Sequence, residues 1–380
     1  MIPFNKPYLT GKETRYLNQA VQSGHISGNG IFTRKCQHYF EEKYGFGKCL
    51  LTTSCTAALE MAALLCDIKE GDEVIMPSFT FVSTANAFVL RGAKIIFADS
   101  RIDHPGIDED SIEELITRKT KAIVIVHYAG VACDMDKIMN LANKYGLLVV
   151  EDAAHAVDSN YTGNDGVNRV LGSIGHFATF SFHETKNITC GEGGMLVVND
   201  KRFQARAEVI WEKGTNRSAF FRGEVDKYSW VDLGSSFLLS EINASFLWAQ
   251  IENLKDVQAR RTSHWNTYQN ALEDWAMDQG ILLATIPDYA SNNAHMFYMV
   301  CQSLEKRMQL LRSLNKKGIE AVFHYQSLHK SPYYRRQNNI TLPHAERYSD
   351  CLLRLPMFYE LAPQGVIDEL LELKIESRIV

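Results

Sequence analysis

The sequence lacks the features that mark nucleic-acid-binding, secreted and membrane proteins. Its 40 lysines and arginines are outnumbered by 45 aspartates and glutamates, and the formal net charge is −5 at pH 7. A nucleic-acid or anionic-membrane binder normally carries a basic stripe instead. No run of about 18 apolar residues is present, which argues against a transmembrane helix. Residues 1–7 contain two prolines and no apolar segment, so we expect neither a signal peptide nor any membrane association.

Paired cysteines are also absent. The eight cysteines are scattered along the chain and include no Cys-x-x-Cys pair. This spacing suits neither a zinc site nor a disulfide framework. We therefore expect reduced thiols, no bound metal and a cytoplasmic protein. No internal repeat or low-complexity tract is visible, so the composition predicts a compact globular protein.

The length and the apolar pattern predict an α/β fold in two domains. A chain of 380 residues exceeds the usual size of one hydrophobic core. We expect a large domain over residues 1–245 and a smaller one over residues 246–380. Strand candidates alternate with helix candidates between residues 48 and 150, which favours an α/β domain with right-handed crossovers. The expected strands are 49–52, 73–76, 94–98, 122–126 and 147–150; the expected helices are 56–65, 80–90, 110–117 and 135–145. The continuous apolar runs at 94–98 and 122–126 are typical of strands buried on both faces of a parallel sheet.

The second half of the chain begins with a long helical segment. Helical composition with few breakers over residues 241–272 predicts a helix that links the two domains. Residues 295–301, 304–317 and 321–325 then indicate strand, helix and strand, and residues 366–373 a last helix.

Lys186 is the first candidate for chemistry. The alternating run 179–182 predicts a short strand, after which Lys186 lies on a turn before the glycine-rich segment 191–194. An amine in such a place can form a Schiff base with a carbonyl group. A lone lysine on a turn is more often a solvated surface residue. The interpretation therefore depends on the other residues of the site.

Two further motifs lie where strands end. Residues 53–56, Thr-Ser-Cys-Thr, mark a strand-to-helix junction, where a helix N-terminus favours an anion such as phosphate; a plain N-cap is the alternative. Asp152 follows the apolar run 147–150, at the sheet edge where ligands of α/β proteins bind. A carboxylate there can hold a pyridinium nitrogen protonated, although a helix cap would explain it equally well.

Other residues are ambiguous by themselves. Phe79 or Phe81 can stack on a flat ring or pack in the core, and His155 can face a ligand or be a satisfied polar residue. The charged loop 213–228, with Arg217, Arg222 and Lys227, can meet a diphosphate or a partner subunit, or be solvated. His324, Tyr325 and His329 of the second domain can border the same pocket.

The order and spacing of these motifs resemble a pyridoxal-phosphate (PLP) enzyme of fold type I, and more closely the DegT/DnrJ/EryC1/StrS aminotransferase family. The residues that carry the resemblance are 151–155, Glu-Asp-Ala-Ala-His, then 180–183, Phe-Ser-Phe-His, with Lys186, and 191–194, Gly-Glu-Gly-Gly. The similarity extends over nearly the whole chain. It implies a mostly parallel central sheet flanked by helices and a smaller α+β C-terminal domain.

The resemblance also implies a set of site residues. Lys186 holds the cofactor and moves the proton, Asp152 pairs with the pyridine nitrogen, and His183 orders the site. The remaining cofactor contacts are implied for Ser181, Thr56 and the Cys55 backbone at the phosphate, Phe81 stacked on the ring, and His155 beside it.

One segment departs from the family pattern. Many members carry an asparagine that reaches the phosphate bound by the neighbouring subunit of a homodimer. Here that segment reads Gly-Ser-Ser-Phe-Leu over residues 234–238. Ser236 can still donate a hydrogen bond, so it stays a candidate cofactor contact, and the resemblance implies a homodimer with sites at the interface.

Within the family, segments 53–61, 76–93, 127–136 and 213–217 look closest to the enzymes that transfer the amino group of L-glutamate to C4 of dTDP-4-keto-6-deoxyglucose with a galacto outcome. A gluco outcome or amination at C3 remains open. Related sugar 3-dehydratases replace the lysine with histidine, which Lys186 argues against. A non-catalytic regulator on the same scaffold would be expected to lose Lys186 or Asp152.

Overall fold

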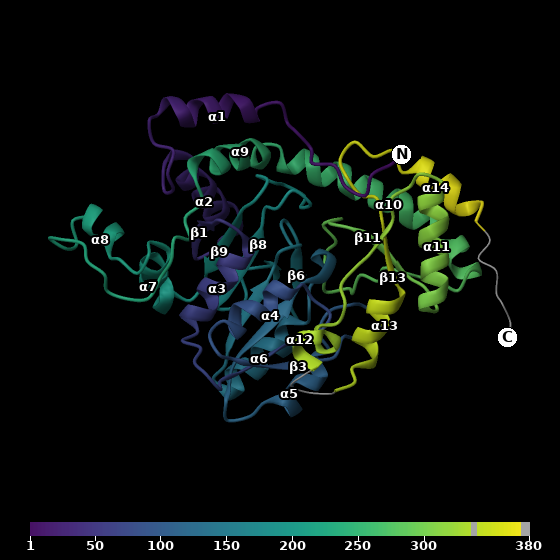
Figure 1. Ribbon diagram of the computed structural model, residues 1–380, viewed down its shortest axis with the longest axis horizontal. Helices are drawn as coiled ribbons and strands as arrows, with labels where there is room; N and C mark the ends of the chain where they lie inside the picture. Colours follow the sequence, from purple (N-terminus) through teal and green to yellow (C-terminus); the bar gives the residue numbers. More distant parts are fainter. Residues whose placement is uncertain (336–339, 374–380) are drawn as a thin grey trace.

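The large lobe is built on a seven-stranded sheet (Figure 1). The computed structural model describes residues 1–335 and 340–373. The strands lie in the order β1-β9-β8-β5-β4-β2-β3, and β9 alone runs antiparallel to its neighbours. Their bounds are β1 Lys48–Thr52, β2 Glu73–Pro77, β3 Lys94–Ala98, β4 Thr120–Val126, β5 Leu148–Asp152, β8 Phe177–Ser181 and β9 Gly194–Val198. The predicted mostly parallel central sheet is confirmed.

Helices cover both faces of this sheet, which explains the continuous apolar runs. Val149 packs into the core on one face, and its neighbour Val150 into the core on the other. Successive side chains of a strand point to opposite faces, so a strand covered on both faces must be apolar throughout. The helices of this lobe are α1 Glu13–Gln22, α2 Ile31–Tyr44, α3 Cys55–Leu65, α4 Val82–Val89, α5 Ile112–Leu115, α6 Met135–Tyr145, α7 Lys201–Trp211, α8 Arg217–Phe221 and α9 Glu241–Ile251.

The second lobe is smaller and has its own antiparallel sheet, in the order β10-β11-β13-β12. Its strands are β10 Leu282–Leu283, β11 Phe297–Val300, β12 Val322–Phe323 and β13 Leu352–Leu355. Its helices are α10 Leu254–Asp278, α11 Leu304–Lys316, α12 Pro332–Arg335, α13 Pro343–Cys351 and α14 Gln364–Leu371. A two-stranded ribbon, β6 Asn160–Thr162 with β7 Asn168–Val170, belongs to the large lobe.

The segment expected to form one linking helix forms two. The chain turns at Glu252 and Asn253, and α10 then continues six residues beyond the expected end at 272. The start of α10 packs through Leu254 into the core of the large lobe, whereas Tyr268 and Leu272 pack in the core of the second lobe. The helix thus runs from one lobe to the other (Figure 1). Residue 245 lies inside α9, and a domain division near it stays a prediction.

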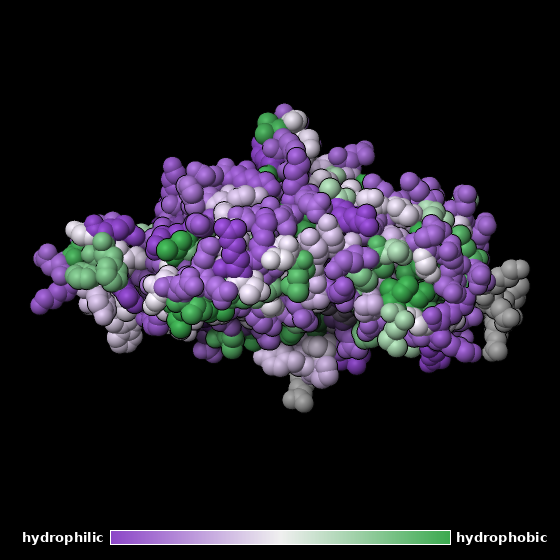
Figure 2. Space-filling model, turned by 90° about the horizontal axis from the view of Figure 1, so that it is seen from above, coloured by the Kyte–Doolittle hydropathy of each residue, from purple (hydrophilic) through white to green (hydrophobic). Residues whose placement is uncertain are grey.

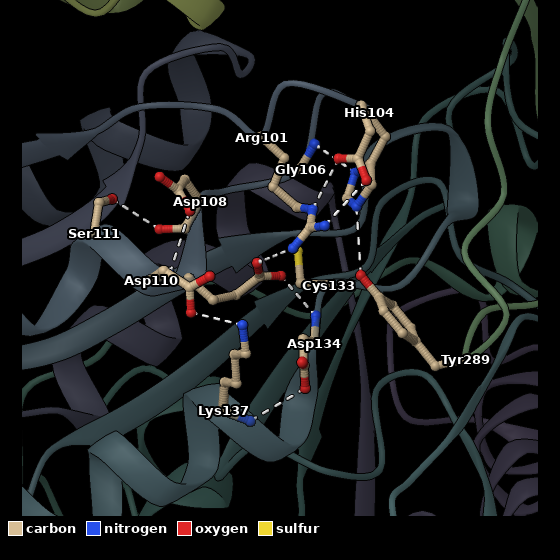
Figure 3. A network of polar contacts seen from close by, with 12 residues as sticks. Arg101, His104, Gly106, Asp108, Asp110, Ser111, Cys133, Asp134, Lys137 and Tyr289 are labelled. Carbon is tan, nitrogen blue, oxygen red and sulfur yellow. Dashed lines mark hydrogen bonds and ion pairs between the residues drawn. The ribbon is translucent and has the colours of Figure 1, made fainter.

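A polar network around Arg101 fixes the loop after β3 (Figure 3), and a hydrogen bond from Tyr348 joins it to the second lobe. Arg101 bonds to Asp103 at 3.0 Å and to Glu109 at 3.1 Å, and Glu109 accepts the backbone N–H of Asp134. Burial lowers the pKa of the neighbouring His104 to about 4, so this imidazole is neutral at physiological pH. The Tyr348 hydroxyl of α13 donates to the Arg101 carbonyl at 3.0 Å. This network therefore holds the second lobe against the carboxyl edge of the large sheet.

Within residues 1–335 and 340–373, no helix combines the length and the apolar character that a membrane span requires. All eight cysteines are free, and seven of them are buried.

Candidate active site

The main cavity lies at the carboxyl edge of the large sheet, where the second lobe covers it. It has a volume of about 750 Å³, within the usual range for small-molecule sites. The large lobe contributes the ends of β4, β5 and β8, the start of α3 and residues 80–84. The second lobe contributes His295, Met296, Val322, His324, Tyr325, Arg354 and Met357.

Lys186 lines this cavity from a turn, as expected. Its backbone N–H donates to the His183 carbonyl at 2.9 Å, which closes the turn after β8. Among the described residues, its amine has no hydrogen-bond or ion-pair partner. Burial lowers the pKa of this amine to about 8, against the opposing effects of Cys55 and Asp152. A substantial neutral fraction near pH 8 makes Lys186 a competent nucleophile toward a carbonyl group.

Asp152 ends β5 and lies buried in the cavity wall. Its Oδ2 accepts the Thr84 hydroxyl at 2.7 Å, and its Oδ1 accepts the Ala154 N–H at 3.2 Å. Burial raises the pKa of this carboxyl group, while these donors and the charge of Lys186 oppose the shift. A buried carboxylate in this position can accept a hydrogen bond from the protonated ring nitrogen of a cofactor that Lys186 holds.

The adjacent Glu151 has a structural role instead. It points to the opposite face of the sheet, where it contacts His127 Nε2 at 2.9 Å and accepts the backbone N–H groups of Gly172 and Ile174. Strand alternation therefore separates the two acids of the motif.

An anion cradle lies at the N-terminus of α3. Ser54 is the N-cap of α3, and its hydroxyl accepts the Ala57 N–H at 3.0 Å. Cys55 and Thr56 line the cavity. The first residue of β9, Gly194, passes so close that an added Cβ would lie 2.3 Å from the Ser54 carbonyl carbon. Ser181 ends β8 beside this turn and also lines the cavity. Free N–H groups at a helix start, with hydroxyls around them, suit a phosphate.

The two candidate aromatic residues, Phe79 and Phe81, differ in their exposure. Phe79 is fully buried and packs against Tyr128 and Tyr348. Phe81 remains 54% exposed, lines the cavity and lies 6.0 Å from Tyr325 between ring centroids. Of the two, only Phe81 can stack on a bound ring.

His155 belongs to a layer of imidazoles in the cavity wall. Its ring stacks on His295 with centroids 4.3 Å apart, and its Nδ1 accepts the Ala129 N–H at 3.3 Å. Burial holds the pKa of His155 well below its usual value. His295 in turn contacts the Asn187 amide at 2.8 Å, one residue after Lys186. The second lobe thus fixes both His155 and the lysine turn.

Other sequence candidates lie at the rim or outside the cavity. The His183 imidazole lies at the rim, 3.0 Å from the Thr185 hydroxyl and 3.6 Å from Glu192, and forms no hydrogen bond with the side chain of Lys186 or Asp152. His324 and Tyr325 line the cavity, whereas His329 binds Ser78 and Glu346 elsewhere.

Ser236 is exposed and does not line the cavity of its own chain. That Ser236 reaches a neighbouring subunit's phosphate stays a prediction.

The cavity residues that sequence reasoning missed include Thr84, His295 and Arg354. Thr84 stands one helical turn after Thr80, in a segment that also contains the polar residues Ser83 and Asn86. Arg354 interrupts the apolar run 352–355, and a lone charge inside a buried strand was the available signal.

Comparison with known proteins agrees with this site. The model of the DegT/DnrJ/EryC1/StrS aminotransferase family matches residues 7–370. DesV of S. venezuelae is 29% identical, with a TM-score of 0.87 and 98% of each chain covered. Helicobacter pylori PseC is 25% identical, with a TM-score of 0.88 and the same coverage. Spr1654 of Streptococcus pneumoniae, solved in its PMP form, is 25% identical with a TM-score of 0.89 over 97% of this chain and 98% of its own.

Three observations support the same assignment. The family model matches nearly the whole chain, the central sheet is mostly parallel, and a reactive lysine and a buried aspartate line one cavity. The chain belongs to the DegT/DnrJ/EryC1/StrS aminotransferase family and is a PLP-dependent aminotransferase of fold type I.

Proposed function

We propose that this enzyme transfers the amino group of L-glutamate to C4 of dTDP-4-keto-6-deoxy-D-glucose. The products are dTDP-4-amino-4,6-dideoxy-D-galactose and 2-oxoglutarate. The observation that supports amino transfer most strongly is the single cavity that holds Lys186, Asp152 and the cradle at the start of α3. The sugar substrate is supported by the resemblance of segments 53–61, 76–93, 127–136 and 213–217. PseC, one of the similar proteins, acts in the biosynthesis of pseudoaminic acid.

The cavity residues fit PLP at each of its functional groups. Cys55 N–H, Thr56 and Ser181 would hold the phosphate, Phe81 and His155 would enclose the ring, and Asp152 would accept a hydrogen bond from the ring nitrogen. When bound, the cofactor supplies an electron sink for the carbon that loses or gains a proton. Ser236 of a neighbouring subunit adds a phosphate contact in this proposal.

Lys186 carries out the proton transfers. Its amine, with a pKa near 8, is able both to accept and to return a proton at neutral pH. Asp152 supports this chemistry because an ionised carboxylate holds the ring nitrogen protonated. His183 acts at a distance, by ordering the turn that carries Lys186 through its contact with Thr185.

The proposal includes a homodimer in the cytoplasm that serves surface-glycan synthesis, as in enterobacterial common antigen or an O-antigen. The segment 214–234 around α8 projects from the large lobe (Figure 1) and exposes Phe221, Tyr228 and Trp230. Figure 2 shows green, hydrophobic residues at that projecting end, on the left of the view. Exposed aromatic residues on a projection favour a partner that covers them.

The decisive experiment is NMR of the product formed from dTDP-4-keto-6-deoxyglucose and L-glutamate. We expect an amino group at C4 with the galacto configuration. The gluco epimer would replace the proposed outcome with that alternative. A 3-aminotransferase needs a ketone at C3 and would leave this 4-keto sugar without an amino group. No amino sugar at all would refute the substrate assignment.

A further inference from the structure

A second pocket lies where the two lobes meet, and it shares no lining residue with the main cavity. Its volume is about 510 Å³, within the usual range for small-molecule sites, which often lie between domains. Helices α10 and α13 and strands β10 and β11 of the second lobe supply most of its wall, and residues 102 and 103 of the large lobe complete it. We call it the lobe-interface pocket.

Three large apolar side chains around the lobe-interface pocket are exposed. Ile102 of the large lobe, Met277 of α10 and Leu282 of β10 keep 66%, 72% and 52% of their surface open to solvent. Single exposed apolar residues are common on protein surfaces, but several around one pocket are typical of a binding site. The wall therefore offers an apolar surface to part of a ligand.

Tyr298 of β11 contributes a hydroxyl without a partner. The residue is only 3% exposed and lines the lobe-interface pocket, and its hydroxyl forms no hydrogen bond within the described chain. Burial raises the pKa of Tyr298, so the hydroxyl stays protonated and is able to donate. Polar groups of buried residues are normally paired, and a ligand in this pocket would supply the missing acceptor.

Two opposite charges line the same pocket without a counter-charge. Arg347 of α13 and Glu273 of α10 form no ion pair or hydrogen bond within the described chain. The other acid of the wall, Asp103, is already neutralised by Arg101, whose Nε and Nη2 each donate to it at 3.0 Å. Among the described lining residues, the pocket thus offers one unpaired cation and one unpaired anion beside its apolar surface.

We propose that the lobe-interface pocket binds an α-amino acid with an apolar side chain. Arg347 and the Tyr298 hydroxyl bind its carboxylate, since a guanidinium fork matches a carboxylate with two parallel hydrogen bonds. Glu273 binds its ammonium group, and the apolar side chain covers the exposed apolar wall. A simple anion or cation would leave one of the two charges unpaired. The side chain is apolar because the described wall has no second unpaired cation for another carboxylate.

Methionine-methyl NMR of the PLP-loaded enzyme locates the probe L-phenylalanine. Met277 lines the lobe-interface pocket, whereas Met296 and Met357 line the main cavity, so one labelled sample reports on both sites. We expect a saturable shift of the Met277 signal, which Met277→Leu assigns. The shift should be lost in Thr285→Trp, because Thr285 is an exposed residue of the pocket wall and an indole there fills the space. The proposal is overturned by an unchanged Met277 signal at the solubility limit of L-phenylalanine, by shifts confined to Met296 and Met357, or by a Met277 shift that persists in Thr285→Trp.

Two fragments of the probe test the charge contacts through the same Met277 signal. 3-Phenylpropionate lacks the ammonium group, and phenethylamine lacks the carboxylate. Arg347→Gln should weaken L-phenylalanine and 3-phenylpropionate about tenfold, the usual loss of a hydrogen bond to a charged group, and leave phenethylamine unchanged. Glu273→Gln should weaken L-phenylalanine and phenethylamine about threefold, because Glu273 is exposed.

Arg312→Gln is the matched control, since Arg312 is an exposed arginine of the same lobe that does not line the pocket. It should leave the affinity for all three probes unchanged. Equal effects of Arg347→Gln on all three probes, or of Glu273→Gln on all three, would overturn the proposal that the pocket recognises both charges of an amino acid.

Discussion

The Thr84 hydroxyl donates a 2.7 Å hydrogen bond to Asp152 Oδ2, joining the first turns of α4 to the end of β5. Thr80 lies 2.9 Å from Thr84 between hydroxyl oxygens, so a short chain of hydroxyls ends on this carboxylate. Burial raises the pKa of Asp152, and the bond from Thr84 opposes that shift. Thr84 therefore helps to keep Asp152 ionised in the cavity.

Thr84→Val should make activity more sensitive to acid. Without this donor the Asp152 carboxyl protonates more easily, and a protonated acid no longer holds the ring nitrogen protonated. A lost hydrogen bond to a charged group predicts about a tenfold lower kcat at the acidic end of the profile, with a smaller loss above pH 8. The measurement is kcat between pH 5.5 and 9. Ser83→Ala is the control, since Ser83 bonds to Thr56 rather than to Asp152. A uniform loss at every pH would contradict this role.

Asp152→Asn should inactivate the enzyme but stabilise the cofactor-free protein. The folded pKa of Asp152 lies above its unfolded value of 3.8, so the folded state binds this proton more tightly. Stability from this group is present at low pH and is lost as the pH rises through the folded pKa. The variant avoids that loss, and its advantage in the free energy of urea unfolding should be larger at pH 7 than at pH 4. A variant less stable than wild type at pH 7 would show that burial is not the main influence on the pKa of the Asp152 carboxyl group.

Cofactor capture should depend on pH with a midpoint near 8. The neutral amine of Lys186 is the nucleophile, and burial lowers its pKa to about 8 from 10.5. Stopped-flow mixing of cofactor-free enzyme with PLP should give a rate that rises to about pH 8 and then levels off. A rate still rising steeply between pH 9 and 10 would mean that Lys186 titrates like an ordinary surface lysine.

Gly194→Ala should weaken PLP binding at least tenfold and destabilise the fold. The added Cβ would lie 2.3 Å from the Ser54 carbonyl carbon and 2.4 Å from the Cys55 nitrogen, so the start of β9 must move away from the cradle. Overpacking of this kind costs about 1–3 kcal/mol. Gly191→Ala is a matched control: it has a positive φ of 79° but no atom within 4 Å of the added Cβ. It should lose stability through backbone strain while PLP affinity is kept. Equal PLP affinities for the two variants would contradict the steric account.

The elements of the large sheet were predictable because their patterns are local. Continuous apolar runs such as 94–98 gave β3 with its observed bounds, and α6 matched the expected 135–145. The four-residue strand β13 and helix α13 were missed, since β13 is apolar only around a central arginine and pairs with strands at least 28 residues away. Short strands that depend on distant partners leave little local signal.

The residues of the candidate site also fall into those with a local sequence signal and those without one. Lys186 and Asp152 were found because each belongs to a contiguous motif at a strand end. Thr84, His295 and Arg354 reach the cavity only through the arrangement of helices and strands far apart in sequence. Glu151 shows the opposite case: it stands in the same motif as Asp152 but faces the other side of the sheet.

The proposed mechanism depends on Lys186 as the residue that binds the cofactor carbonyl. Borohydride reduction of the PLP-loaded enzyme, followed by peptide mass spectrometry, tests it directly. The account predicts bleaching of the yellow absorbance and a single phosphopyridoxyl group on the peptide that contains Lys186. It also predicts that Lys186→Ala has neither the absorbance nor turnover. A label on another lysine, or normal turnover in Lys186→Ala, would contradict the account.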